Sequence, residues 1–355
     1  MKIGIVGDLH FKDSLSFSFS VKDHREKEKQ DVLQTIISSL ADCDSVVFMG
    51  DQLDTKQSSP HVIKDFITFI EAFHDKQLFF LAGNHEKWGD GRSAIDFLRE
   101  VKNKQWHVIS NSILRTFIDG KRFVFLPYFT PSELERRWGG QDKQENVERI
   151  LAELHGEFLF AHHAISGVET YEGQTDLFKE IVLPMEKLLE KIPIVFAGHI
   201  HKPGVYTFGS KFCCMTGSIF TKNVGEDEKF VWKLDIDSKQ LERVQLPVRP
   251  IKRISSEHLS ASELEEMLES CPSDSILRII NTNPELSFEN ILKKTKQFDG
   301  VSIKNEFVKI RKQIQIDEDE FHQKDIPGLL RIFAKIRNLP EEDVLQGFDL
   351  IPNTV

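Results

Sequence analysis

The stretch that decides the fold is SVVFMGDQLD, residues 45–54. Four apolar residues follow Ser45 and predict a short strand, which ends at Gly50, just before the acidic residues Asp51 and Asp54. The apolar run is continuous rather than alternating, which is typical of a strand buried on both faces of a sheet. The segment therefore predicts a buried strand that delivers carboxylates to one edge of its sheet.

Four more segments repeat this arrangement, each an apolar run that ends in residues able to bind metal. Stretches with the helix period lie between them, and this alternation predicts an α/β sheet with both faces covered. Ligands bind such sheets beyond the carboxyl ends of the strands, where all five motifs fall. The expected strands are Lys2–Val6, Ser45–Met49, Gln77–Leu81, Glu157–Ala161 and Pro193–Ala197; the expected helices are roughly Asp23–Leu40, Ser59–Phe73, Arg92–Val101, Asp142–Leu154 and Thr175–Lys191; and the motifs are Asp8–His10, Gly50–Asp54, Gly83–Glu86, His162–His163 and Gly198–His201.

The motifs consist of Asp, Asn and His, ligand types that suit manganese, iron or zinc. Two metals about 3.5–4 Å apart can clamp the attacking and leaving oxygens of a phosphoryl transfer, and Asp51 is the natural carboxylate to bridge them. Asn84 offers a neutral oxygen, and His85 is placed to protonate a leaving oxygen or to stabilise transition-state charge. Each motif alone has an ordinary explanation, such as a core histidine, a turn or a helix cap. Five in order at strand ends predict a two-metal phosphoesterase site.

With these motifs the chain resembles the calcineurin-like metallophosphoesterase superfamily, and the likeness runs through all five. The resemblance implies a four-layer α/β fold in which two packed mixed β-sheets are flanked by helices. His162 is preferred to His163 as a ligand because it comes first after its strand, and Glu86 stands where close members often have Asp. The implied ligands are Asp8, His10, Asp51 and His201 for one metal and Asp51, Asn84, His162 and His199 for the other, with His85 as the catalytic histidine.

Three segments resemble DNA repair nucleases of the SbcD type: Gly50–Thr55 with Ser59 and Pro60 behind it, Phe123–Phe129, and Thr216–Ser218 followed by Glu226. Asp54 stands where archaeal relatives often have a second histidine, which favours the bacterial or phage branch. The resemblance implies a manganese-dependent nuclease in double-strand-break repair and recombination, with 3′-to-5′ exonuclease action on duplex ends and endonuclease action on single strands. A phosphodiesterase or phosphatase that does not act on nucleic acid is an alternative, and an inactive scaffold is a weaker one.

The order of elements after Leu246 divides the chain into three parts. Residues 1–246 form the expected phosphoesterase domain. Residues 247–316 are expected to fold in β-α-β-α-β order, with helices at Ala261–Glu269 and Ser287–Phe298 and strands at Ser275–Ile280 and Gly300–Lys309, and they resemble the small α+β capping domain of SbcD-type nucleases. Residues 317–355 begin with an acidic run and continue as a helical tail.

The resemblance also implies partners. The tail, over residues 326–350, is expected to dock on the coiled coil of an SMC-like ATPase of the SbcC type, the alternative being that it packs on its own chain. A homodimer is implied as well, for which the helices expected at Asp23–Leu40 and Ser59–Phe73 are the candidates. DNA is the implied substrate.

Composition limits these expectations. The net charge of −10 argues against a protein that holds DNA by bulk electrostatics, although bound cations would offset part of it. Four cysteines without a disulfide pattern, an expected first strand at Lys2 and the lack of a long apolar run predict a cytoplasmic protein without signal peptide or membrane span. The basic residues in or near motif loops, which are candidate substrate contacts, are Lys12, Lys56, Lys87 and Arg92, with Lys202 and Lys222 beside them.

Overall fold

The computed structural model describes most of the chain up to residue 305. The described residues are 1–16, 22–101, 103–139, 142–171, 180–226, 228–256, 259–281, 283, 286–296, 298 and 300–305. All of them belong to one unit, Met1–Glu306. The predicted tail with its partner segment 326–350, and the end of the strand predicted at Gly300–Lys309, lie outside the described residues.

The first of two large sheets has the strand order β14-β13-β1-β2-β3-β4. Its strands β1 to β4 are parallel, and β13 and β14 extend it as an antiparallel hairpin beside β1. Parallel pairing explains why the apolar runs are continuous, since helices on one face and the second sheet on the other bury both sides. The strands are β1 (Lys2–Val6), β2 (Ser45–Phe48), β3 (Gln77–Leu81), β4 (Trp106–Ile109), β13 (Phe230–Asp235) and β14 (Leu241–Gln245).

The second sheet repeats this plan in the order β11-β12-β10-β7-β6-β5. Strands β12, β10, β7 and β6 are parallel, while β11 and β5 close the two edges in antiparallel pairing. Two short strands, β8 (Ala164–Ile165) and β9 (Val182–Leu183), pair separately. The strands of the second sheet are β5 (Leu114–Ile118), β6 (Lys121–Leu126), β7 (Phe158–Ala161), β10 (Ile194–Ala197), β11 (Gly204–Phe208) and β12 (Lys211–Met215).

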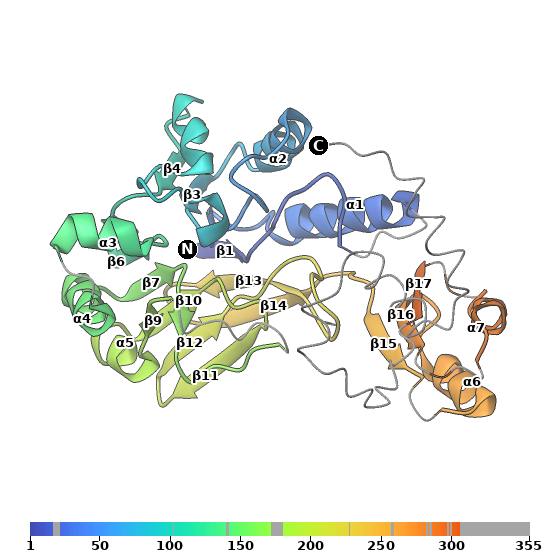
Figure 1. Ribbon diagram of the computed structural model, residues 1–355. Helices are drawn as coiled ribbons and strands as arrows, with labels where there is room; N and C mark the ends of the chain where they lie inside the picture. The colour runs from blue at the N-terminus through green and yellow to red at the C-terminus, as the bar shows by residue number, and fades with distance from the viewer. Residues whose placement is uncertain are drawn as a thin grey trace, which may run out of the picture. The chain divides into compact units, whose positions relative to one another are not determined.

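Alternate residues of each strand separate into two cores. Val47 and Phe79 pack in the cluster between the two sheets, whereas Val46 and Phe48 pack in the cluster under the helices. Phenylalanine rings fill the space between the sheets, and the rings of Phe79 and Phe125 stack across it with centroids 4.7 Å apart. Figure 1 shows the resulting helix–sheet–sheet–helix order, which confirms the predicted four-layer fold.

The helices begin where the sequence supplies a cap. Before α2, the Ser59 hydroxyl accepts a hydrogen bond from the Val62 N–H at 3.3 Å, and Pro60 occupies the first turn, where its missing N–H costs nothing. The first sheet is covered by α1 (Lys22–Ser39), α2 (Pro60–Glu71) and 3-10 helices at Asn84–Glu86 and Ala94–Glu100, and the second by α3 (Pro131–Trp138), α4 (Lys143–Glu153) and α5 (Met185–Lys191).

Two predicted helices need correction. The helix expected at Arg92–Val101 is a 3-10 helix over Ala94–Glu100. The prediction of one helix over Thr175–Lys191 was wrong. Val182–Leu183 form strand β9 instead, and α5 begins only at Met185. Pro184 is the reason, since its ring disfavours helical geometry in the residue before it.

A smaller sheet follows the large ones. Its strands pair in parallel in the order β15-β16-β17, and two helices alternate with them, as the predicted β-α-β-α-β order requires. Leu264 and Leu268 of α6 pack with Leu277 and Ile279 of β16 in a separate apolar core. The domain boundary at 246/247 stays a prediction. The elements are β15 (Ile251–Ser255), α6 (Ala261–Ser270), β16 (Ile276–Asn281), α7 (Phe288–Lys294) and β17 (Gly300–Asn305).

None of the described helices is both long enough and apolar enough to cross a membrane.

Candidate metal centre

Five loops that follow parallel strands meet at one edge of the two large sheets. The loops after β1, β2 and β3 come from the first sheet, and those after β7 and β10 come from the second. Neighbouring strands in each group are parallel, so their carboxyl ends lie together. The side chains that they carry are Asp8, His10, Asp51, Asn84, His85, His162, His199 and His201.

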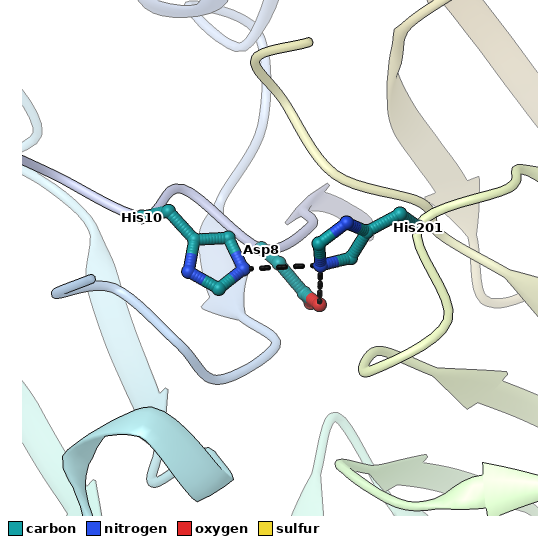
Figure 2. Close-up of side chains that lie close together, drawn as sticks. All are labelled: Asp8, His10 and His201. Atoms are coloured by element: carbon teal, nitrogen blue, oxygen red, sulfur yellow. Dashed lines mark hydrogen bonds and ion pairs between the residues drawn. The ribbon is translucent and has the colours of Figure 1, made fainter. Parts of the chain in front are cut away.

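Asp8, His10 and His201 form a first cluster. The Nε2 atoms of His10 and His201 lie 3.1 Å apart, and His201 Nε2 lies 3.9 Å from Asp8 Oδ2. Figure 2 shows both rings turning a nitrogen toward the other, with the Asp8 carboxylate beside His201. Ligands about 2.1 Å from one cation and at right angles stand about 3 Å apart, so the spacing of the two histidines suits a shared ion. All three side chains are buried, and together they could hold a metal ion.

Asp51 lies between this cluster and a second group of ligands. Its Oδ2 is 3.7 Å from His10 Nε2 on one side and 3.6 Å from His162 Nε2 on the other. Beyond His162, the Asn84 Oδ1 atom lies 3.2 Å from His162 Nε2 and 2.9 Å from His199 Nδ1. The geometry places Asp51 where one carboxylate can serve two cations.

The backbone around these side chains takes conformations that most residues avoid. His10, Asp51 and His199 have positive φ angles of 47°, 49° and 78°. Non-glycine residues in such regions cost about 1–3 kcal/mol each, and they cluster where function requires the geometry. Gly83 is required for a different reason, because a Cβ atom there would lie 2.0 Å from Asp51 Oδ1.

The electrostatics of the centre suit divalent cations. Burial raises the pKa of Asp8 well above its usual value, and the charge of Asp51 raises it further. The pKa of Asp51 is held well below its usual value, despite burial that opposes the shift, because histidines surround it, His162 foremost. Burial lowers the pKa of His10 to about 3, so its ring is neutral and can donate a lone pair. Two carboxylates among imidazoles, without a thiolate, fit manganese, iron or zinc.

His85 stands at the mouth of the centre. Its Nδ1 donates a hydrogen bond to the backbone oxygen of Asp54 at 2.7 Å, which leaves Nε2 facing Asp51 Oδ2 at 4.0 Å. The side chain is 37% exposed, whereas that of Asp51 is 2% exposed. A ring at this boundary can transfer a proton to a leaving oxygen. The same atom could join His10 and Asp51 in holding an ion, so the acid role of His85 stays a prediction.

The structure brings His162, rather than His163, to the centre. His163 Nε2 lies 3.2 Å from the Pro127 carbonyl oxygen, and its ring stacks on Tyr128 with centroids 5.3 Å apart. Burial lowers the pKa of His163 to about 3. His163 is therefore a neutral packing residue, as expected for the neighbour that points to the other side.

Lys87 is the one predicted substrate contact that the structure places in the interior. Its side chain is buried, and its ammonium donates to the Glu133 carboxylate at 2.5 Å and to the Ser110 carbonyl at 2.6 Å. A buried ammonium needs such partners to offset its lost hydration. The prediction that Lys87 contacts substrate is therefore corrected, because its buried ammonium binds Glu133 and Ser110 in the interior and stabilises the fold.

The other basic residues named from the sequence stay near the surface. Lys56 lines a pocket of about 490 Å³ together with Asn84, His85 and Trp88. Lys12 Nζ lies 3.7 Å from Asp54 Oδ2. The remaining three form ion pairs: Arg92 with Asp90 at 2.7 Å, Lys202 with Glu169 at 2.5 Å and Lys222 with Asp54 at 3.0 Å.

Three residues outside the predicted ligand set reach the centre. Glu180 Oε2 lies 2.6 Å from His199 Nε2, and Glu226 Oε1 lies 3.6 Å from His201 Nδ1. Lys222 Nζ donates to Asp54 Oδ1 at 3.0 Å. The position of Glu226 after the Thr216–Ser218 segment could have indicated it, whereas no local pattern points to Glu180.

Glu86 braces the centre without reaching it. Its carboxylate accepts hydrogen bonds from the N–H groups of Gly83 and Leu53, each at 2.9 Å. It thereby ties the loop after β3 to the loop after β2. Burial raises the pKa of Glu86 to about 8, and the charge of Asp51 adds to the shift.

Comparison with known proteins gives the class. The family model for calcineurin-like phosphoesterases matches residues 1–203, more than half of the chain. The chain therefore belongs to the calcineurin-like phosphoesterase family, a class of metal-dependent phosphoesterases, and the clusters described above supply its candidate ligands. A search of curated proteins found no match to the sequence.

Solved structures with similar folds are distant in sequence. An archaeal phosphodiesterase is 16% identical, with 69% of this chain and 100% of that chain covered and a TM-score of 0.36. Vps29 of Entamoeba histolytica is 12% identical (69% and 99% covered, TM-score 0.31), and phosphopantetheinyl hydrolase of Mycobacterium tuberculosis is also 12% identical (61% and 90% covered, TM-score 0.36). Likeness at this level carries no argument about substrate.

Proposed function

We propose that the chain is a manganese-dependent DNA nuclease of the SbcD type, with 3′-to-5′ exonuclease action on duplex ends and endonuclease action on single strands. The observation that carries the proposal is the pocket of about 490 Å³ beside Asn84 and His85, which Lys56 and Trp88 also line. A cation for the phosphate backbone next to an aromatic ring is a combination that binds single nucleic-acid strands, and the Arg92 guanidinium, 5.8 Å from the centroid of the Trp88 ring, adds a second positive charge there. The pocket opens on the residue proposed to protonate the leaving group.

The proposed ligands divide around Asp51. Asp8, His10 and His201 would hold one cation with Asp51, and Asn84, His162 and His199 would hold the other with it. When bound, two divalent cations supply Lewis-acid stabilisation of the phosphoryl group and activation of water. The 3.1 Å spacing of the His10 and His201 Nε2 atoms, and the position of Asp51 between His10 and His162, support this division.

The protein's own residues carry the remaining steps. His85 keeps its Nδ1–H on the Asp54 carbonyl oxygen, so the ring is oriented with Nε2 toward the centre. A proton held at Nε2 can pass to the leaving 3′-oxygen as the phosphodiester bond breaks. The backbone N–H of His85 donates to Asp51 Oδ1 at 2.9 Å and so holds the proposed bridging carboxylate in place.

The smaller sheet bears on the wider role of the chain. The parallel unit over residues 251–305 has the element order expected of the SbcD-type capping domain. We propose that the chain acts in a reducing cytoplasm as a homodimer, with an SMC-like ATPase of the SbcC type bound through residues 326–350. The four cysteines are unpaired, which is compatible with that compartment.

A second candidate function is a metallophosphodiesterase or phosphatase for small molecules or proteins. The net charge of −10 favours it, because proteins that bind DNA by themselves usually present a basic face. Under the first proposal this charge predicts weak DNA affinity for the isolated chain and a contribution from the ATPase partner.

The deciding experiment measures cleavage of end-labelled duplex and single-stranded DNA with manganese, for the wild type and for His85→Ala. Loss of a general acid is expected to slow cleavage about 10²- to 10⁴-fold, while the number of bound Mn²⁺ ions stays the same. His74→Ala removes an exposed histidine at the end of the α2 region and serves as the matched control.

Each outcome has a distinct meaning. Near wild-type cleavage by His85→Ala would remove its acid role, and the loss of one bound Mn²⁺ would make it a ligand instead. Turnover of a chromogenic phosphodiester without any DNA cleavage, also after addition of the coiled-coil ATPase, would favour the second candidate.

A second substitution tests the substrate class. Trp88→Ala is expected to raise KM for single-stranded DNA roughly tenfold, because a base stacked on an aromatic ring contributes about 1–3 kcal/mol. Turnover of a chromogenic phosphodiester that has no base to stack should stay unchanged and provides the internal control. An equal loss on both substrates would show that Trp88 supports the loop and does not bind a base.

A further inference from the structure

The candidate ligand histidines share a feature that the ligand sets do not explain. Each turns one ring nitrogen toward the centre and has an oxygen atom within 3.6 Å of the other, and His10 Nδ1 also lies 3.1 Å from Lys222 Nζ. The outward contacts are His10 Nδ1 to Asp54 Oδ1 at 3.2 Å, His162 Nδ1 to the Met49 carbonyl at 2.7 Å, His199 Nε2 to Glu180 Oε2 at 2.6 Å, and His201 Nδ1 to Glu226 Oε1 at 3.6 Å.

Two of these oxygens belong to glutamates that lie outside all five motifs. Such a partner fixes which nitrogen carries the proton, and a histidine can bind a cation only through the other one. With Glu226 beside Nδ1, His201 presents the Nε2 lone pair to Asp8 and His10. With Glu180 beside Nε2, His199 presents Nδ1 to Asn84.

Glu226 is held rigidly for this purpose. The side chain is buried, and its Oε2 atom accepts from Lys229 Nζ at 2.7 Å and from the Lys222 N–H at 3.0 Å. The other oxygen accepts from Asn223 Nδ2 at 2.8 Å and is the one that faces His201. A buried carboxylate with this many donors is costly to place and cannot swing away, which suits a residue that orients another.

Glu180 reaches the centre from a different part of the chain. It lies just before β9, and its side chain is 24% exposed, against 9% for His199. Its Oε2 atom lies 2.6 Å from His199 Nε2, so this carboxylate faces the outward nitrogen of the ring while Nδ1 lies on the inward side, 2.9 Å from Asn84 Oδ1.

We propose that Glu226 and Glu180 are positioning residues, each serving one of the two metal sites. Glu226 orients His201 for the cation shared with Asp8 and His10, and Glu180 orients His199 for the cation shared with Asn84 and His162. The inference rests on the proposed metal centre. It adds that substitution of one glutamate should weaken metal binding at one of the two sites and leave the other unchanged.

The test uses the full chain and Mn²⁺ alone, with free Mn²⁺ counted by electron paramagnetic resonance during titration. Glu226→Gln and Glu180→Gln keep the size of the side chain and remove its charge. Each is expected to weaken one of the two binding steps about 10- to 100-fold, the usual effect of losing the partner of a metal-bound histidine. Glu228→Gln and Glu186→Gln change exposed glutamates in the same regions and should bind like the wild type.

The Asn84→Ala background assigns each glutamate to its site. This variant lacks a proposed ligand of the second site, so its remaining tight step belongs to the Asp8 site. Adding Glu226→Gln should weaken that step, whereas adding Glu180→Gln should leave it unchanged. A merely structural role for either glutamate would weaken both sites or neither.

Glu226 also neutralises the buried Lys229, so its variant could lose stability. The double variant Glu226→Gln/Lys229→Met leaves neither charge alone and is expected to show the same selective loss, with the melting temperature of the metal-free protein as the check. Wild-type binding of two Mn²⁺ ions with unchanged or equally weakened steps in the glutamate variants would overturn this inference alone. A wild type that binds no Mn²⁺ would overturn both it and the proposed function.

Discussion

Two sheet edges in this protein have the same topology and opposite chemistry. At the edge where β1, β2 and β3 end, the loops carry Asp, Asn and His. At the corresponding edge of the smaller sheet, β15 is followed by Ser256 and β16 ends in Asn281. Both edges are the carboxyl ends of parallel strands, the usual place for a ligand in an α/β sheet.

The described residues of the smaller edge are joined by a hydrogen-bond network. The Ser256 hydroxyl donates to Asn281 Oδ1 at 2.7 Å, and Asn281 Nδ2 donates to the Leu286 carbonyl at 2.8 Å. The Asn283 N–H adds a third bond, to Asn281 Oδ1 at 3.2 Å. In these three bonds donors meet acceptors, the described groups that they join are neutral, and the bonds stabilise the fold.

At the larger edge, side chains that can bind a cation face one another. The Nε2 atoms of His10 and His201 approach each other at 3.1 Å, and the buried carboxylates of Asp8 and Asp51 repel each other, which contributes to the raised pKa of Asp8. Such a set gains most when a cation is shared among its members. Topology therefore selects the place, and the complementarity of the polar groups decides whether it becomes a ligand site or a structural network.

The substitution with the largest expected effect on the difference between the two edges is Asp51→Asn. We expect DNA cleavage to fall by about 10³-fold or more and both Mn²⁺ sites to weaken, because one carboxylate serves both. The melting temperature of the metal-free protein should fall, because the lowered pKa of Asp51 means that the surrounding histidines stabilise its charge in the folded state. Cleavage assays, Mn²⁺ titration and calorimetry measure the three effects. A lower melting temperature with intact Mn²⁺ binding would make Asp51 a structural residue like Asn281.

A smaller effect is expected from Gly83→Ala. The new Cβ atom would meet Asp51 Oδ1 at 2.0 Å and the Asp51 backbone nitrogen at 2.3 Å, so the carboxylate must move. A displacement near 1 Å costs about 10²-fold in rate, and cleavage should fall by that order. Gly89→Ala is the matched control, because nothing lies within 4 Å of its new Cβ. Equal rates for the two variants would contradict the close packing assigned to Gly83.

Much of the fold could be predicted because continuous apolar runs identify buried parallel strands. Strands β1 and β3 begin and end at the predicted residues, Lys2–Val6 and Gln77–Leu81. The prediction was wrong around Val182–Leu183, where apolar residues spaced like a helix form a two-residue strand next to Pro184. So short an element depends on its partner β8, which no local pattern reports.

The metal centre likewise contains residues that could be predicted from the sequence and residues that could not. Its motif residues could be found because a place directly after a strand is enough to bring them together. The burial of Lys87 could not, since it depends on Glu133, 46 residues away. The approach of Glu180 to His199 likewise comes from the folding of a distant loop onto the centre. Residues that support a site through tertiary contacts leave no local signal, and the structure is needed to find them.

The last prediction concerns the smaller edge, where the comparison requires an effect on stability alone. Asn281→Ala removes a buried side chain that makes three hydrogen bonds, and it leaves the Ser256 hydroxyl without its acceptor. Such a change costs about 1–3 kcal/mol, which chemical unfolding of the metal-free chain can measure. Mn²⁺ affinity and the cleavage of a chromogenic phosphodiester should stay at wild-type values, because the described members of the network carry no charge. If Mn²⁺ binding weakened together with stability, the two edges would be coupled, and the smaller sheet would belong to the metal centre's support.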